Sequence, residues 1–254
     1  MAVPIIPMAQ PKQESKMIRV TILTFNRDAA LSLAALRCVR RRLPDAAVTV
    51  ADDGHDPVTA DVAAHMRALG ARYVQTDFPR RGNLNGSSCV RGILNTLLDG
   101  TADDDVAIKL DSDTALRSDG PVRRMLAVGA EGFGSCCDGR IMCGLCYGFT
   151  GSALRRMLAV LDRLPIGGDD PEDIATGRLA MAAGIPLHIE RPWAASRPEG
   201  RWAAYRWPTM PAVAKYDRLD VVTLGTLHMP RQQMDATEFI RVFDELAARD
   251  VIGE

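Results

Sequence analysis

The sequence predicts a single α/β domain built around a mostly parallel β-sheet. Short apolar, β-branched runs alternate with longer segments that carry leucine and alanine at helical spacing. Several apolar runs end in polar residues, most clearly at Asp111 and Asp113. Alternating strands and helices favour parallel strands joined by right-handed crossovers. The polar strand ends then meet at one edge of the sheet, where folds of this class bind ligands.

The first half of the chain repeats a strand, loop, helix pattern. The run at 18–25 is continuously apolar and ends at Asn26, and the run at 46–51 leads into Asp52 and Asp53. A Gly-Ser-Ser sequence at 86–88 offers a helix start. We therefore expect strands at 18–25, 46–51, 72–75 and 106–110, and helices at 29–42, 58–69 and 87–98.

The second half begins with a predicted β-hairpin, because Asp138-Gly139 lies between two apolar runs. Pro171 suits the first turn of a helix, and Asp235-Ala-Thr-Glu238 resembles a capping box. We expect helices at 151–164, 172–183 and 235–249, and strands at 185–189 and 221–224.

Composition is that of an ordinary globular protein. The 254 residues are 47% hydrophobic and 25% charged, which suits one large domain. The net charge of −1 does not favour nucleic acid as a partner. No apolar run approaches the roughly 20 residues of a membrane span, and the N-terminus does not resemble a secretory signal. These features predict a cytoplasmic protein, and they leave contact with a membrane surface open.

We divide the chain into four parts. Residues 1–16 form a loose leader, because prolines interrupt a short apolar patch there. We expect residues 17–110 and residues 111–234 to form the two halves of one domain. Residues 235–254 form a C-terminal helix.

The Asp111-Ser-Asp113 sequence is the strongest candidate for a metal site. Because successive side chains of a strand point to opposite faces, Asp111 and Asp113 share one face and Ser112 faces away. Two carboxylates on one face repel each other unless a cation joins them. Mg²⁺ and Mn²⁺ prefer oxygen ligands and are often held by one or two carboxylates together with substrate phosphates. The alternative is a solvated acidic turn at the end of a strand.

Two other clusters allow both a functional and a structural interpretation. Cys136, Cys137, Cys143 and Cys146 could form a metal or redox site, or they could be small buried side chains on the hairpin. The second cluster comprises Trp193, Trp202, Tyr205 and Trp207. Their aromatic faces suit sugar rings, but they could equally hold a proline-rich loop in place.

Several motifs resemble the GT-A glycosyltransferases, in particular the family 2 nucleotide-sugar transferases. Val20-Thr-Ile-Leu-Thr-Phe-Asn26 resembles their first strand, and Val48-Thr-Val-Ala-Asp-Asp-Gly54 their second. Asn83-Leu-Asn-Gly-Ser-Ser-Cys-Val-Arg91 is similar to the segment that enters their nucleotide-side helix. Leu110-Asp-Ser-Asp113 resembles their Asp-x-Asp signature, and Pro171-Glu-Asp-Ile174 their Glu-Asp motif. The resemblance covers roughly residues 17–187 and implies a GT-A, Rossmann-like fold. It also implies that residues 17–110 form a nucleotide-binding half and residues 111–234 the metal- and acceptor-binding half of the same domain.

The resemblance also implies a role for each matching residue. Thr24 and Asn26 would line the nucleotide pocket, Asp53 would bind the base, commonly uracil, and Arg91 would lie near the ribose or diphosphate. Asp111 would contact the ribose or the metal shell, and Asp113 would bind the metal, Mn²⁺ or Mg²⁺. Asp173 would be the general base, and Glu172 would orient an acceptor hydroxyl. His228 is the candidate third metal ligand, and Trp202 a candidate sugar contact.

These roles describe one reaction. A metal on the diphosphate would stabilise the leaving group, and a carboxylate would remove the proton of the attacking hydroxyl. The Glu-Asp pair favours a direct displacement that inverts the anomeric centre. The expected partners are a nucleotide-sugar donor, for which we expect a UDP-sugar, and a glycan, glycolipid or other hydroxyl acceptor.

The match has departures, and other functions remain open. Pro171 precedes the Glu-Asp pair where a small or aromatic residue is common, so Asp169 and Asp170 compete for the role of base. The chain lacks the Gly-x-Gly-x-x-Gly turn of dinucleotide-binding proteins and a Walker-type phosphate loop. The alternative functions are a nucleotidyltransferase acting on sugar phosphates and a noncatalytic nucleotide-sugar-binding protein.

Overall fold

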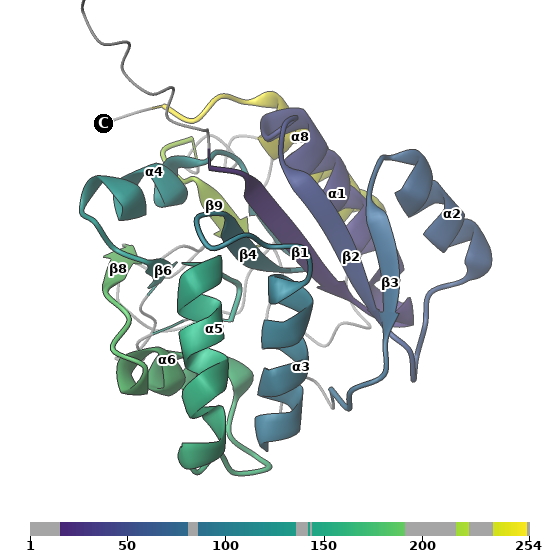
Figure 1. Ribbon diagram of the computed structural model, residues 1–254. Helices are drawn as coiled ribbons and strands as arrows, with labels where there is room; N and C mark the ends of the chain where they lie inside the picture. Colours follow the sequence, from purple (N-terminus) through teal and green to yellow (C-terminus); the bar gives the residue numbers. More distant parts are fainter. Residues whose placement is uncertain are drawn as a thin grey trace, which may run out of the picture.

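The computed structural model describes residues 16–80, 86–135, 142, 144–190, 217–223 and 236–252 (Figure 1). The strands are β1 (Ile18–Thr24), β2 (Ala47–Asp53), β3 (Arg72–Thr76), β4 (Val106–Asp111), β5 (Thr114–Leu116), β6 (Gly132–Ser135), β7 (Cys146–Thr150), β8 (Leu187–Glu190) and β9 (Val221–Thr223). The helices are α1 (Ala29–Arg42), α2 (Ala60–Ala68), α3 (Gly86–Leu98), α4 (Gly120–Ala127), α5 (Gly151–Val160), α6 (Glu172–Ala182) and α8 (Ala236–Ala248).

A mixed but mostly parallel sheet forms the centre of the molecule. Its strand order is β3-β2-β1-β4-β7-β6-β8, and β1 to β4 are mutually parallel. Strand β7 runs antiparallel to both β4 and β6. Val20 and Ile22 of β1 are completely buried, as expected for a central strand with helices over both faces. The predicted α/β architecture is therefore confirmed.

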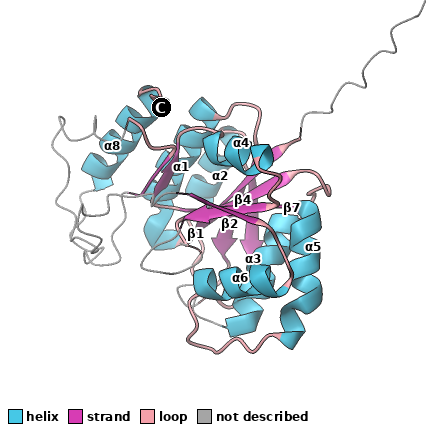
Figure 2. Cartoon of the chain, turned by 90° about the vertical axis from the view of Figure 1, so that its left-hand side faces the viewer, coloured by secondary structure: helices cyan, strands magenta, loops and turns pink. Residues whose placement is uncertain are grey.

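Helices cover both faces of this sheet (Figure 2). One apolar core joins the sheet to α1, α4 and α8 through residues such as Leu36, Met125 and Phe243. A second core lies on the opposite face and joins the sheet to α3, α5 and α6 through residues such as Ile93 and Leu154. The sheet contains strands from both predicted halves of the chain, so the two halves share one framework.

Most predicted elements have the expected type and nearly the expected bounds. Helix α1 matches its predicted range, whereas α5 ends at Val160 and is followed by a 3-10 helix at Leu161–Arg163. Strands β6 and β7 pair in antiparallel fashion, as a hairpin requires. The Asp138-Gly139 turn and Asp235 lie outside the described residues.

The structure corrects the prediction for the acidic pair. Strand β4 ends at Asp111, and Ser112 and Asp113 form a turn before β5 begins at Thr114. Asp111 and Asp113 therefore do not occupy alternate positions of one continuous strand. The sequence pattern also did not predict β5 and α4, because both are short and the pairing of β5 depends on β9, about a hundred residues later.

A buried arginine links the C-terminal helix to the rest of the domain through hydrogen bonds. The Arg117 guanidinium donates to the carbonyls of Leu219, Leu246 and Arg249 at 3.0, 3.2 and 2.9 Å. Its side chain is completely buried, so these carbonyl contacts replace the water that it loses. In the described part of the chain, no helix is both long and apolar enough to cross a membrane.

Candidate active site

Three parallel strands bring the predicted residues to one edge of the sheet. In the strand register, Leu23 of β1 pairs with Asp111 of β4, and Thr24 pairs with Asp52 of β2. The strand exits are also tied together, because the Asn26 amide donates to the Asp56 carbonyl at 2.8 Å. The sheet therefore places the ends of β1, β2 and β4 side by side, as the sequence predicts.

The two neighbouring aspartates at the end of β2 have different environments. Asp52 is completely buried and accepts hydrogen bonds from the Val58 amide at 2.9 Å and the Tyr73 hydroxyl at 2.5 Å. Burial raises its pKa despite these bonds. Asp53 is partly exposed, with its side chain 17% accessible, and contacts His55 at 3.2 Å. Only Asp53 of this pair is therefore placed to meet a ligand.

Thr24 and Asn26 also differ in their exposure to solvent. The Thr24 side chain is fully buried, and its hydroxyl accepts a hydrogen bond from Ser32 at 2.5 Å. Asn26 is exposed at the start of a short 3-10 helix, Asn26–Asp28. Thr24 therefore belongs to the interior beneath this edge of the sheet, whereas Asn26 faces solvent.

Arg80 is a site residue that sequence reasoning missed. Its guanidinium is only 6% exposed and donates to the Thr24 carbonyl at 3.1 Å, the Ala51 carbonyl at 2.9 Å and the Thr76 hydroxyl at 2.9 Å. Within the described residues, its Nε has no hydrogen-bond partner. Burial lowers its pKa, whereas the charges of Asp53, Asp52 and Asp111 act in the opposite direction. Arg80 thus adds one positive charge near three carboxylates at the strand ends, those of Asp52, Asp53 and Asp111.

The turn that carries Asp113 is anchored to the first strand exit. The Ser112 hydroxyl donates to Asp28 Oδ2 at 2.7 Å in a buried contact. Asp113 is half-buried, and its Oδ1 accepts a hydrogen bond from the Thr114 hydroxyl at 3.3 Å. The middle residue of Asp-Ser-Asp therefore fixes the turn, and the flanking aspartates are left nearer to solvent.

A buried lysine connects the Asp111 side of the site to helix α6. Lys109 lies within β4 and is completely buried. Its Nζ is 2.6 Å from Asp111 Oδ1 and 3.8 Å from Glu172 Oε2, and it also donates to the Gly144 carbonyl. Burial disfavours its charged form, but the carboxylates of Asp111 and Glu172 outweigh that effect and raise the pKa of Lys109. The ammonium therefore stays charged.

Glu172 is part of the interior. Its side chain is 4% exposed, and its Oε1 accepts a hydrogen bond from the Tyr147 hydroxyl at 2.5 Å. Burial raises the pKa of Glu172 to about 7, Lys109 opposes the rise, and Asp111 adds to it. A carboxylate in this position contacts protein groups on several sides, so it is poorly placed to meet an acceptor directly.

Asp173, the next residue, is half-buried at the first turn of α6. Its Oδ2 accepts from the Gly144 amide at 3.1 Å, and its Oδ1 accepts from the Ile174 amide at 2.8 Å. The competing Asp170 is held by the Gly167 amide at 2.8 Å and by Arg178 at 3.3 Å. Of these two aspartates, Asp173 lies beside the Lys109 cluster, and Asp170 belongs to the preceding loop.

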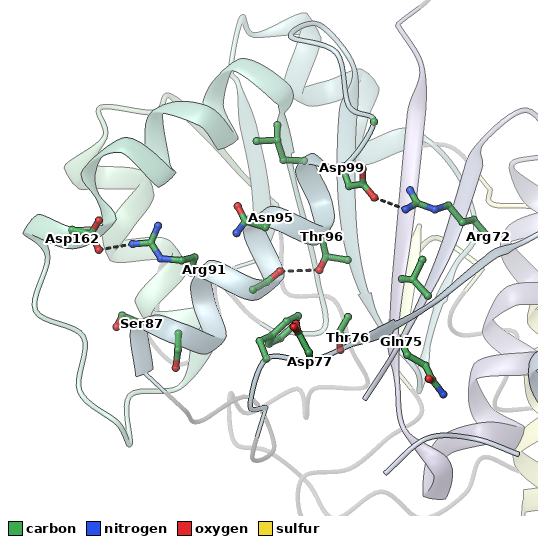
Figure 3. Close-up of a pocket in the computed structure, with 16 residues that line it drawn as sticks. Arg72, Gln75, Thr76, Asp77, Ser87, Arg91, Asn95, Thr96, Asp99 and Asp162 are labelled. Carbon is green, nitrogen blue, oxygen red and sulfur yellow. Dashed lines mark hydrogen bonds and ion pairs between the residues drawn. The ribbon is translucent and has the colours of Figure 1, made fainter. Parts of the chain in front are cut away.

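Arg91 lies in a separate groove between β3 and α3 (Figure 3). The groove has a volume of about 920 Å³, and Phe78, Ser88, Asn95 and Thr96 are among its lining residues. Arg91 pairs with Asp162, and Arg72 pairs with Asp99 at 2.5 Å. Neither Asp111 nor Glu172 lines this groove, so the structure does not bring Arg91 to the acidic cluster.

Asp111 and Asp113 are the candidate metal ligands within the described residues. No group of three or more His, Cys, Asp or Glu side chains in this part of the chain is arranged to hold a metal. Two carboxylates still fit a cation whose remaining ligands are substrate phosphates and water. Trp202 and His228 lie outside the described residues. Strand β9, which precedes His228 in sequence, pairs Thr223 with Thr114, next to Asp113.

The cysteine cluster is described only in part. Cys146 is completely buried on β7, and burial raises the pKa of its thiol. This is the environment of an unreactive structural cysteine. Cys136, Cys137 and Cys143 lie outside the described residues.

Comparison with known proteins supports the fold. No protein-family model matches the chain, and no curated protein sequence matches it. The galactosyltransferase LgtC, solved with donor and acceptor sugar analogues, has a similar structure, with 14% identity and a TM-score of 0.52 over 89% of this chain and 95% of LgtC. A protein reported as a nucleotide-diphospho-sugar transferase from Desulfovibrio desulfuricans has 10% identity and a TM-score of 0.48 over 92% of this chain and 97% of its own. The likeness to LgtC confirms the predicted GT-A fold.

Proposed function

We propose that the protein is a metal-dependent glycosyltransferase that moves a sugar from a nucleotide diphosphate, most simply UDP, to an acceptor hydroxyl. One observation carries the proposal. Lys109 bonds Asp111 at the end of β4, Asp173 at the start of α6 accepts from the Gly144 amide, and Lys109 donates to the Gly144 carbonyl. This chain of contacts between the proposed donor-side carboxylate and the proposed base supports the assignment, because the two are far apart in the sequence.

The donor would occupy the edge of the sheet formed by β1, β2 and β4. Asp53 is the partly exposed carboxylate of its pair and would accept a hydrogen bond from the nucleotide base. Asn26 would contact the same nucleotide from the next strand exit. Arg80 would reduce repulsion between the acidic crevice and an anionic donor, because its charge lies beneath Thr24 and Ala51.

Asp111 and Asp113 would hold Mn²⁺ or Mg²⁺ on the donor diphosphate, with His228 as the proposed further ligand. When bound, such an ion stabilises the negative charge that develops on the leaving diphosphate. The protein's own contribution is to fix the turn, which it does through the Ser112 to Asp28 hydrogen bond.

Asp173 would act as the general base. It would accept the proton of the acceptor hydroxyl as that oxygen attacks the anomeric carbon, a role that typically contributes about 10²- to 10⁴-fold in rate. Two backbone amides donate to its carboxylate and hold it in a fixed orientation. Glu172 would support this arrangement from the interior through Tyr147 and Lys109. A single displacement by this base inverts the anomeric centre.

An activity screen tests the proposal. The purified protein is incubated with Mn²⁺, a UDP-, GDP- or dTDP-sugar and a set of simple sugar acceptors, and nucleoside diphosphate release and product anomeric configuration are measured. We expect release from one donor class with inversion at the transferred sugar. Pyrophosphate formation from UTP and a sugar 1-phosphate would indicate a nucleotidyltransferase, and donor binding without turnover would indicate a binding protein.

A further inference from the structure

We propose that Lys109 is a positioning residue that holds the donor-side carboxylate Asp111 and the base Asp173 in one fixed arrangement. The inference rests on the proposed function and extends it to a residue outside the motifs. Lys109 lies in β4, in the otherwise apolar run Val106-Ala-Ile-Lys-Leu110, and its neighbours Ile108 and Leu110 are also buried.

Burial of this ammonium has a large cost unless the protein supplies partners. Removing an ion from water costs several kcal/mol even after the protein relaxes. Ion pairs with Asp111 at 2.6 Å and Glu172 at 3.8 Å, and a hydrogen bond to the Gly144 carbonyl, offset this cost for Lys109. A leucine or valine at this position would fill the strand without that cost, so the contacts themselves are the reason for a lysine.

The contacts join both sides of the proposed site. On the donor side, Lys109 bonds Asp111 directly. On the acceptor side, it bonds the carbonyl of Gly144, whose amide donates to Asp173 Oδ2 at 3.1 Å. The backbone of Gly144 therefore links Lys109 to the proposed base, because its carbonyl bonds Lys109 and its amide bonds Asp173.

The charge balance supports the same role. Three carboxylates, Asp111, Glu172 and Asp173, all act electrostatically on the Lys109 ammonium. Without that charge they would repel one another and separate. Because a misplacement of about 1 Å can reduce a reaction rate by about 10²-fold, loss of Lys109 should impair turnover more than donor affinity.

The test compares four variants of the full chain with the wild type. Lys109→Met keeps an unbranched side chain and removes the charge, and Lys109→Met/Glu172→Gln removes the buried ion pair as a unit. Glu172→Gln alone reports the contribution of that carboxylate. Arg117→Met is the matched control, because Arg117 is also completely buried but contacts the C-terminal carbonyls. Each variant is measured for thermal unfolding, UDP-sugar affinity with Mn²⁺, and kcat and KM.

We expect Lys109→Met to be destabilised, because it leaves the buried Glu172 carboxylate without its cation, and the double variant to regain much of that stability. In the double variant, kcat should stay reduced by about 10²-fold or more while the donor KM changes much less. Glu172→Gln should itself lose part of its kcat, so the contribution of Lys109 is the further loss of kcat from Glu172→Gln to the double variant. Arg117→Met should lose stability but keep the kcat of the folded protein.

Two results would overturn the inference in distinguishable ways. Recovery of kcat together with stability in the double variant, with an active wild type, would reduce Lys109 to a structural residue and leave the proposed function intact. A folded wild type that transfers no sugar from any donor in the screen would overturn the proposed function and the positioning role together.

Discussion

The Ser112 hydroxyl lies 2.7 Å from Oδ2 of Asp28, in a buried hydrogen bond that joins residues 84 positions apart. Asp28 closes the short 3-10 helix after β1, and Ser112 lies between Asp111 and Asp113. The bond therefore fixes the turn of the Asp-Ser-Asp sequence relative to the end of β1.

Replacing Ser112→Ala should lower both stability and donor binding. The variant leaves the buried Asp28 carboxylate without this donor, which typically costs about 1–3 kcal/mol. We expect a lower unfolding midpoint and weaker binding of UDP-sugar with Mn²⁺, because the turn is released. Ser152→Ala is a suitable control, since that hydroxyl contacts Thr150 at the start of α5, away from the crevice. Equal loss of donor affinity in both variants would argue against a specific role for Ser112.

Asp173→Asn should separate donor binding from sugar transfer. The amide cannot accept the proton of the attacking hydroxyl, so we expect kcat to fall by about 10²- to 10⁴-fold while donor affinity is retained. Asp170→Asn is the matched control, because Asp170 is held by Gly167 and Arg178. If transfer survives in Asp173→Asn and is lost in Asp170→Asn, the base is Asp170.

Replacement by alanine should lower stability at Asp52 and nucleotide affinity at Asp53. Asp52 is buried with Tyr73 and Val58, so Asp52→Ala should destabilise the fold by about 1–3 kcal/mol. Asp53 is partly exposed, so Asp53→Ala should leave the unfolding midpoint nearly unchanged and weaken nucleotide binding. Unfolding curves and titration with UDP measure the two effects. Unchanged UDP affinity in Asp53→Ala would remove Asp53 from the binding site.

Glu172 should make folding stability depend on pH. Its pKa rises from 4.5 to about 7 in the folded protein, chiefly because of burial, so the folded state holds this proton more tightly than the unfolded state. The contribution of Glu172 to the free energy of unfolding is therefore greatest below pH 4.5 and is lost as the pH rises to about 7. At about 1.4 kcal/mol per pKa unit, this loss amounts to about 3 kcal/mol.

Urea unfolding of the wild type and Glu172→Gln between pH 4.5 and 8 measures this contribution. The glutamine variant should gain stability relative to the wild type as the pH rises, because it has no carboxyl to ionise. A constant difference between the two proteins across this range would mean that Glu172 does not titrate there.

Local sequence patterns predicted the strands of the sheet because their apolar and β-branched runs are continuous, and they predicted α1 because its buried residues recur at helical spacing. They also predicted that Asp53 and Asp111 would lie at one sheet edge, since parallel strands align their carboxyl ends. The interpretation failed at the Asp-Ser-Asp turn because β5 depends on pairing with β9, which no local pattern encodes.

The patterns also missed Lys109 and Arg80, although both lie near residues that were identified. A lysine inside an apolar strand is a visible signal, because charged residues are seldom buried without partners. Its partners Glu172 and Gly144 come from distant segments, so only the folded chain reveals them. Arg91 shows the reverse case, since its motif suggested the diphosphate whereas its side chain lies in the β3–α3 groove.

Thermal unfolding with nucleotide-sugars tests the donor site most directly. The wild type and Asp113→Asn are each measured with UDP-, GDP- and dTDP-sugars, with and without Mn²⁺. For the wild type we expect one nucleotide class to raise the unfolding midpoint in a Mn²⁺-dependent way, corresponding to about 2.7 kcal/mol at a ligand concentration of 100 times Kd. Asp113→Asn should lose the metal-dependent part of that rise. An equal rise in both proteins, or no rise with any nucleotide-sugar, would contradict a metal-assisted donor site at Asp111 and Asp113.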